Sequence, residues 1–113
     1  MVDLRSLRED PHTFREALRR RGRDPSLVDQ ALELDRSWRE ALQEVERLRA
    51  QQNRASEEVA RLAPEARGQK IAEVRELAAR LKELEPEVRR RREELERVLL
   101  LFPNPPHPTV PDG

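Results

Sequence analysis

A seven-residue repeat of apolar side chains constrains the fold of this chain more than any other feature. Its a and d positions alternate at spacings of three and four residues. Before residue 63 they are Ala31, Trp38, Val45, Gln52 and Val59 at a, with Leu34, Ala41, Leu48, Ala55 and Leu62 at d. After residue 68 they are Val74, Leu81, Val88, Leu95 and Phe102 at a, with Leu77, Leu84, Arg91 and Val98 at d. The repeat predicts an all-α fold: a long antiparallel two-helix coiled-coil hairpin over residues 24–102, with its tip near residues 63–68.

In an antiparallel pair of helices, the residue numbers of facing residues have a constant sum, so the heptad positions restrict the possible registers of this hairpin to two. Pairing a with d positions allows a sum of about 129 or about 136. The first sum puts Pro64 at the tip and sets Arg91 opposite Trp38, where the guanidinium would lie on the indole ring. The second centres the turn on Gly68 and leaves the base of the first helix unpaired. Both registers remain open from the sequence, and the first is favoured.

Pro86 falls inside the second helix of the hairpin, at an outward position of the repeat. A proline within a helix removes one backbone hydrogen bond and crowds the preceding turn. We therefore expect the second helix to bend near residues 82–86.

Residues 1–23 form an N-terminal segment with its own start and stop signals. Asp10 is a good helix N-cap, Pro11 suits the first helical position, and Gly22 suits the residue just after a helix end. These signals predict a short amphipathic helix over residues 11–21, at the base of the hairpin.

Composition narrows the classes of function. The chain is 35% hydrophobic and 41% charged, with a formal net charge of zero, which suits exposed helices that share a narrow apolar seam. There are no cysteines, and the three glycines and two histidines form neither a phosphate loop nor a metal-ligand spacing. We therefore assign no catalytic residue and no metal ligand. The N-terminus lacks the apolar core of a signal peptide, so we expect a cytoplasmic protein.

Basic residues form stripes along both long helices. Arg47, Arg54 and Arg61 share the c position of the first helix, while Arg75, Lys82 and Arg89 share the b position of the second. Such stripes can follow a phosphate backbone. The plainer alternative is a solvated flank whose arginines pair with glutamates one turn away. Positions c and b lie on opposite broad faces of an antiparallel pair, so the two stripes do not merge into one patch.

Several short stretches, taken in order, resemble a known family. They are MVDLRSLREDP at the N-terminus, RRRG at 19–22, LELD at 32–35, LRAQQNRAS at 48–56, and PNPPHPTVPDG at the C-terminus. Together they are similar to the N-terminal region of bacterial seryl-tRNA synthetase. The resemblance implies the tRNA-binding arm of a serine–tRNA ligase, which cradles the long variable arm and elbow of serine tRNA and positions it for aminoacylation by a class II catalytic core.

The resemblance also implies how this arm relates to the rest of such an enzyme. Residues 103–113 would form a proline-rich linker toward a catalytic domain that these residues do not include. The parent enzyme would be a homodimer, and the isolated arm a monomer or a weak self-associating species. ATP and magnesium would belong to the catalytic domain, so no cofactor is expected within this chain.

The same resemblance suggests which residues contact RNA. The family's LRAERN pattern maps onto residues 48–53, and the serine that follows it maps onto Ser56. Gln51, Gln52 and Glu57 depart from the family pattern, which weakens the expected contact with phosphates near the tip. The expected RNA contacts are Arg47, Arg49, Asn53, Arg54, Ser56, Arg61, Arg67, Lys70, Arg75 and Lys82.

An alternative function from another class is a coiled-coil spacer or dimerisation module without RNA binding. In that case the apolar run at residues 98–102, together with Phe14, would form a docking site for another protein.

Overall fold

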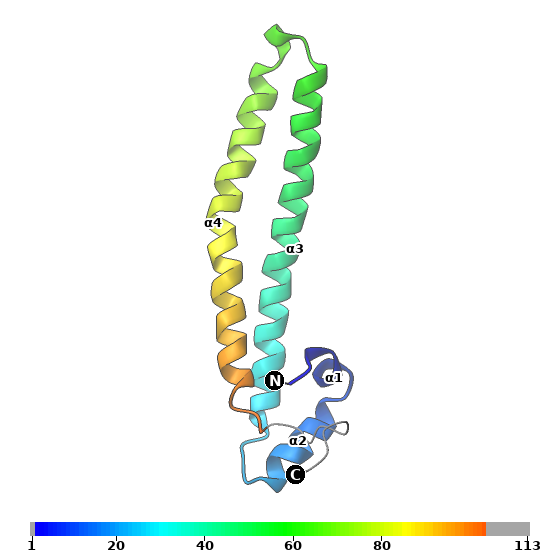
Figure 1. The fold of residues 1–113 in the computed structure, drawn as a ribbon, viewed down its shortest axis with the longest axis vertical. Helices are drawn as coiled ribbons and strands as arrows, with labels where there is room; N and C mark the ends of the chain where they lie inside the picture. The colour runs from blue at the N-terminus through cyan, green and yellow to red at the C-terminus, as the bar shows by residue number, and fades with distance from the viewer. Residues whose placement is uncertain (1, 104–113) are drawn as a thin grey trace, which may run out of the picture. The chain divides into compact units, whose positions relative to one another are not determined.

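The computed structural model describes residues 2–103, in which every regular element is a helix (Figure 1). The elements are α1 (Leu4–Glu9), α2 (Pro11–Arg20), α3 (Ser26–Arg61), the 3-10 helix η1 (Pro64–Ala66) and α4 (Gly68–Leu99). The chain divides into two compact units. We call residues 37–92 the hairpin unit, and residues 2–36 with 93–103 the terminal unit. The predicted all-α class, with two long paired helices and a short helix before them, is confirmed.

The core of the hairpin unit consists of side chains from the predicted a and d positions. Val45, Leu48, Leu77 and Leu81 form a buried cluster, and Leu84 and Val88 pack against it. In Figure 1 the parts of α3 and α4 in this unit run side by side in opposite directions. Burial of this narrow seam removes apolar surface from water, while the charged positions on either side of it remain solvated.

Two contacts across the hairpin unit report its register. Lys70 Nζ lies 2.7 Å from the Glu58 carboxylate, and Arg91 Nη1 donates a hydrogen bond of 2.9 Å to the Ser37 carbonyl oxygen. The residue numbers in each pair sum to 128, which is close to the favoured sum of about 129 and well below about 136. The structure therefore has the register that places the chain reversal next to Pro64.

The partner predicted for Trp38 was wrong by one residue. The guanidinium carbon of Arg92, and not that of Arg91, lies 4.6 Å from the centre of the indole ring. The Arg91 guanidinium makes other contacts: its Nε donates to the Glu87 carboxylate at 3.0 Å, and its Nη1 donates to the Ser37 carbonyl oxygen. A carboxylate and a carbonyl oxygen together satisfy a guanidinium better than the face of an aromatic ring does.

The reversal between the long helices is short and hydrogen-bonded. Ala63 has an extended backbone, with φ −64° and ψ 148°, and Pro64 then begins η1. The Arg67 Nε donates a hydrogen bond of 2.9 Å to the carbonyl oxygen of Leu62. Carbonyl groups at the end of a helix have no N–H donor within the helix. The Arg67 guanidinium supplies a donor for the Leu62 carbonyl group, next to the end of α3.

Pro86 does not end α4, which continues as one α-helix from Gly68 to Leu99. The proline is exposed, so its ring projects into solvent and does not enter the seam. Because Pro86 has no N–H, the carbonyl oxygen of Lys82 lacks its usual partner within the helix. The bend expected near residues 82–86 stays a prediction.

In the terminal unit, α2 matches the predicted short helix to within one residue at its end. The Asp10 carboxylate accepts hydrogen bonds from the Thr13 N–H at 3.3 Å and from the Thr13 hydroxyl at 2.5 Å, so it caps the helix as expected. Gly22 follows the end of α2 with φ +69°, a conformation that favours glycine.

The preceding helix, α1, was not predicted from the sequence. It begins at Asp3, whose carboxylate accepts a hydrogen bond from the Arg5 N–H at 3.2 Å. Leu7 of α1 is fully buried. A helix of 6 residues gives too few turns for apolar periodicity to be visible, so the capping aspartate was its only sequence signal.

A partly buried ion pair joins α1 to α3 within the terminal unit. The Arg8 Nε and Nη2 donate to the two carboxylate oxygens of Asp35, at 2.8 and 3.1 Å. Asp35 is only 1% exposed, and it shares one face of α3 with the fully buried Val28 and Ala31. The parallel two-bond geometry is the strongest form of arginine–carboxylate pair. In the sequence, Asp35 follows Val28 and Ala31 at the three- and four-residue spacing of a buried helix face. A carboxylate at such a position was the signal that could have revealed this pair.

At the end of α4 and just after it, two buried apolar residues flank two exposed ones. Leu99 and Phe102 are 2% and 7% exposed, whereas Leu100 and Leu101 are 72% and 49% exposed. Arg23 holds this segment by donating a hydrogen bond of 3.0 Å to the carbonyl oxygen of Leu101. The apolar run at residues 98–102 is therefore partly core of the terminal unit, and only part of it is available to another protein.

Leu48→Ala is expected to lower the free energy of unfolding by about 2–4 kcal/mol, because the substitution leaves a cavity in the centre of the hairpin core. Urea denaturation followed by circular dichroism would measure this change. Gln43→Ala, at an exposed position of the same helix, is the control and should change the free energy by less than about 0.5 kcal/mol. Equal effects of the two substitutions would contradict the observed seam.

Arg8→Ala is expected to destabilise the packing of α1 by about 2–3 kcal/mol, because the buried Asp35 carboxylate loses both guanidinium hydrogen bonds. The value is below that for a fully buried pair, since 35% of the Arg8 side chain is exposed. Asp35→Asn should cost less, because Arg8 can turn toward water. Hydrogen exchange of the α1 amides would measure both effects. Unchanged protection in the Arg8→Ala variant would contradict the role given to this pair.

Candidate nucleic-acid interface

The paired helices of the hairpin unit present two broad faces. In an antiparallel pair, the e and b positions of both helices lie on one face, and the g and c positions lie on the other. Arg49 pairs with Glu85 at 3.4 Å across the first face. Arg80 lies 3.7 Å from Glu44 across the second. We call these surfaces the Lys82 face and the Glu44 face, after one member of each.

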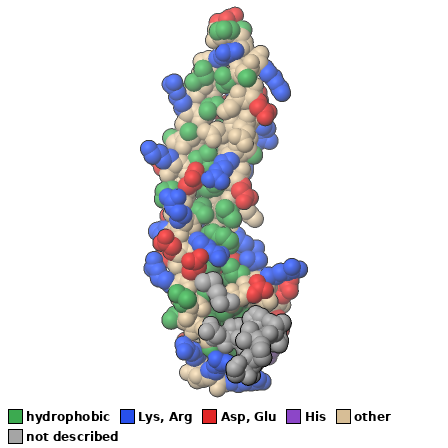
Figure 2. Space-filling model, viewed as in Figure 1, with side chains coloured by type: hydrophobic (Ala, Val, Ile, Leu, Met, Phe, Trp, Pro, Cys, Tyr) green, Lys and Arg blue, Asp and Glu red, His purple; other side chains and the backbone are tan. Residues whose placement is uncertain are grey.

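The two faces differ in charge. The Lys82 face carries six basic residues (Arg39, Arg49, Arg75, Lys82, Arg89 and Arg92) and two acidic residues (Glu46 and Glu85). The Glu44 face carries seven basic residues (Arg47, Arg54, Arg61, Lys70, Arg80, Arg90 and Arg91) and seven acidic residues (Glu40, Glu44, Glu58, Glu73, Glu76, Glu83 and Glu87). Lys70 and Arg91 occupy d positions and are counted here because they contact carboxylates of this face. Figure 2 shows lysine and arginine side chains spread over the exposed surface with acidic side chains among them.

The expected RNA contacts divide between these faces. On the Lys82 face lie Arg49, Asn53, Ser56, Arg75 and Lys82, and all five are exposed. On the Glu44 face lie Arg47, Arg54, Arg61 and Lys70. Arg67 belongs to neither group, because it is half-buried at the tip and its Nε donates to the Leu62 carbonyl oxygen. The structure therefore divides the ten residues into two sets on different faces and one residue at the tip.

Carboxylates engage the basic residues of the Glu44 face closely. The Arg47 Nε donates to the Glu44 carboxylate at 3.0 Å, and this hydrogen bond holds the pKa of Glu44 below its ordinary value. Lys70 lies 2.7 Å from Glu58 and 2.9 Å from Glu73, and its bonds to these two carboxylates raise its pKa. Each such pair lowers the positive potential that a phosphate would meet on this face.

Arg54 and Arg61 on the Glu44 face also lie in the field of an acidic residue. The hydrogen bond from Lys70 lowers the pKa of Glu58 most, and the positive charges of Arg61 and Arg54 lower it further. The arginine stripe of α3 is therefore part of a mixed-charge surface. It is not an unopposed row of positive charge.

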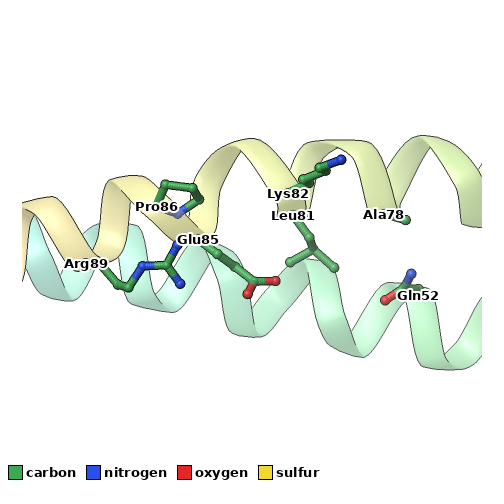
Figure 3. Close-up of a pocket in the computed structure, with 7 residues that line it drawn as sticks. All are labelled: Gln52, Ala78, Leu81, Lys82, Glu85, Pro86 and Arg89. Carbon is green, nitrogen blue, oxygen red and sulfur yellow. The ribbon is translucent and has the colours of Figure 1, made fainter.

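A shallow groove of about 530 Å³ opens on the Lys82 face, between α3 and α4. Its lining residues are Gln52, Ala78, Leu81, Lys82, Glu85, Pro86 and Arg89. Figure 3 shows Lys82 and Arg89 on either side of Pro86 along α4, with Leu81 and Glu85 reaching toward α3 and with Gln52 on α3. Ala78 and Pro86 have short side chains, which leave the space of this groove unfilled.

Sequence reasoning placed Arg89 in a basic stripe but did not assign it to RNA contact. It also overlooked Gln52 and Ala78 as parts of a surface feature, because Gln52 was interpreted as a seam position and a departure from the family pattern, and Ala78 was not considered. Gln52 interrupts the apolar a positions of α3, and Ala78 is the small residue across the seam from it. The sequence signal for a groove was the combination of Gln52, a polar residue in the seam, with Ala78, a small residue beside the seam on the other helix.

At the other end of the hairpin unit, two arginines surround Glu87. Arg90 and Arg91 both hydrogen-bond to its carboxylate. The bonds from Arg90 and then from Arg91 lower the pKa of Glu87 from 4.5 to about 2. This cluster is an ionic network on the Glu44 face, in which the carboxylate remains charged at neutral pH.

Within residues 2–103, the His, Asp and Glu side chains form no group of three that could hold a metal ion. None of the helices in this range is both long enough and apolar enough to cross a membrane.

Comparison with known proteins gives one consistent result. A family model described as "Seryl-tRNA synthetase N-terminal domain" matches residues 1–106. A serine–tRNA ligase of Herpetosiphon aurantiacus is 44% identical over 114 residues, which are 100% of this chain and 27% of that protein. A serine–tRNA ligase of Hyperthermus butylicus is 40% identical over 111 residues, which are 97% of this chain and 24% of that protein. Since archaeal relatives also match, the resemblance is not confined to bacteria.

A solved structure shares the fold. The crystal structure of seryl-tRNA synthetase from Pyrococcus horikoshii complexed with ATP superposes with a TM-score of 0.81 at 35% identity. The match covers 100% of this chain and 26% of that protein. The chain therefore spans about a quarter of the length of the relatives that it matches.

The Glu87 carboxyl is expected to titrate at about pH 2, because Arg90 and Arg91 stabilise its charged form. Its pKa is lowered on folding, so its stabilising contribution is fully present above pH 4.5 and is lost as the pH falls toward 2. An NMR titration of the side-chain carboxyl carbon would measure the midpoint. In an Arg90→Gln/Arg91→Gln variant the midpoint should rise toward 4.5. A wild-type midpoint near that ordinary value would contradict the network.

Proposed function

Because the chain belongs to the family of seryl-tRNA synthetase N-terminal domains, we propose that it is the tRNA-binding arm of a serine–tRNA ligase. Its ligand would be serine tRNA, contacted along the long variable arm and elbow. The observation that carries the proposal is the match of a whole-domain family model to a hairpin with solvated basic flanks. The arm would act by holding and positioning the RNA, and it would carry out no chemical step itself.

The chemistry of the hairpin flanks suits this role. Arginine and lysine side chains on exposed helix positions bind phosphates without reading base identity. A duplex RNA arm presents phosphates and ribose hydroxyls at its surface, and proteins recognise such arms mainly by shape. A two-helix rod with a packed seam is stiff enough to recognise shape, because its flanking side chains are held at fixed spacings along both helices.

The rest of the proposed enzyme lies outside this chain. Serine activation by ATP with magnesium would belong to a class II catalytic domain, and the parent enzyme would be a cytoplasmic homodimer. Residues 104–113, most of the predicted linker, lie outside the described residues.

Two observations weigh against a spacer or dimerisation module. The a and d residues that would pair with another chain, such as Leu48 and Leu81, are already buried within this one. Leu99 and Phe102 of the predicted docking run are buried in the terminal unit. Within that run, Leu100 and Leu101 remain exposed, and two leucines form a small apolar surface.

The chain is expected to bind a serine tRNA with a long variable arm at least about tenfold more tightly than a tRNA with a short one, because only the long arm offers the additional phosphates. Binding titrations of both tRNAs at two salt concentrations would measure this preference, and the affinity should fall steeply at the higher salt. Equal affinity for both, or no binding by a chain shown to be helical, would contradict the proposed function.

A further inference from the structure

On the premise that the arm binds RNA, we propose that it does so with one broad face of the hairpin. The RNA backbone would lie along the Lys82 face, with Lys82 and Arg89 at the groove beside Pro86 as its central contacts. The arginine stripe of α3 on the Glu44 face would lie away from the RNA. This assignment separates residues that sequence reasoning had grouped together.

The first argument is the net charge of each face. The Lys82 face has a formal charge of +4, from six basic and two acidic residues, while the Glu44 face has no net charge, from seven basic and seven acidic residues. A phosphate near either surface responds to all charges within a Debye length of about 8–10 Å. The chain has no net charge overall, so an uneven distribution is needed to attract RNA, and of the two faces of the hairpin unit the Lys82 face is the positive one.

The second argument is the state of the individual cations. On the Glu44 face, Arg47 and Lys70 hold carboxylates within 3 Å, and an approaching phosphate would meet those carboxylates as well. On the Lys82 face, Glu85 is one of only two acidic residues, and Arg49 lies 3.4 Å from it. Arg75, Lys82 and Arg89, which form the row on α4, share that face with only these two acidic residues of the hairpin unit.

The third argument is the shape and spacing of the Lys82 face. Arg75, Lys82 and Arg89 recur every seven residues, so they form a straight row at intervals of about 10.5 Å along α4. Along α4, Glu85 and Pro86 lie between Lys82 and Arg89, and Leu81 lines the groove next to Lys82 (Figure 3). The apolar surfaces of Pro86 and Leu81 could contact a ribose whose neighbouring phosphates meet Lys82 and Arg89.

Gln52 contributes a neutral polar group to the same groove from α3. Its side-chain amide can both donate and accept hydrogen bonds, which matches the donor and acceptor character of a ribose 2′-hydroxyl. The groove therefore combines two cations, apolar contact and an amide with one carboxylate, Glu85, which lies 3.4 Å from Arg49. The cations outnumber the carboxylate, so the groove fits an RNA backbone.

The decisive test compares two double variants that remove the same charge from opposite faces. Lys82→Gln/Arg89→Gln changes the Lys82 face, and Arg54→Gln/Arg61→Gln changes the Glu44 face at the same seven-residue spacing. Glutamine is a good helix former, so both variants should keep their helices, as circular dichroism would check. Each would be titrated with a serine tRNA over a range of salt concentrations.

The Lys82→Gln/Arg89→Gln variant should bind at least about tenfold more weakly, and the slope of log affinity against log salt should fall in magnitude by about 1.5–2. The Arg54→Gln/Arg61→Gln variant should lose less than about threefold, with a slope change below about 0.5. An equal or larger loss in the second variant, with intact wild-type binding, would overturn this assignment and leave the proposed function standing. Absent wild-type binding would instead overturn the proposed function and, with it, this assignment.

A second pair of variants tests the groove without removing a cation. Ala78→Glu places a carboxylate at the groove, and Ala79→Glu places the same group at the next, outward position of α4. Both alanines are exposed, so neither substitution disturbs the seam. Ala78→Glu should weaken tRNA binding about tenfold, and Ala79→Glu by less than about threefold. Similar effects of the two substitutions would overturn the placement of RNA at the groove.

Discussion

The pairing of the apolar seam within a single chain is the constraint on which the hairpin unit depends. Leu48, Leu81 and their neighbours can be buried only if the two helices meet in one register. Once that register is set, every flanking residue has a fixed neighbour across the seam, as the pairs Arg49–Glu85 and Lys70–Glu58 show. The seam thus determines where charges lie on the surface, although it contains almost no charge itself.

Fixing the register sorts a neutral chain into two electrically different faces. Most of this sorting lies on α4, whose e and b positions in the hairpin unit carry four basic residues and one acidic residue, while its g and c positions carry two basic and four acidic residues. The e and b positions of α3 add two basic residues and one acidic residue to the same face. The charge asymmetry depends on heptad position, and composition could not reveal it.

The sequence predicted the features that depend on long-range periodicity. The heptad pattern predicted the seam, the favoured register and the opposite placement of the two basic stripes, and capping signals predicted α2. Features decided by single contacts were missed. Which of Arg91 and Arg92 lies on Trp38 depends on competition with Glu87 and with a backbone carbonyl oxygen, and α1 depends on Asp35 being buried where Arg8 can reach it. The expected RNA contacts fall on two faces, in line with the predicted placement of the stripes, but the different net charge of these faces was not predicted.

The charge of the Lys82 face is difficult to explain by stability. Exposed ion pairs contribute only about 0–1 kcal/mol each, so the fold tolerates almost any arrangement of flanking charge. Six cations against two carboxylates on one face bring like charges together, and one of the six, Arg92, contacts an aromatic ring of the seam, that of Trp38. A spacer would be served as well by the mixed surface found on the Glu44 face. A face with a net positive charge is useful to a protein whose ligand is a polyanion, because the ligand supplies negative charge when it binds.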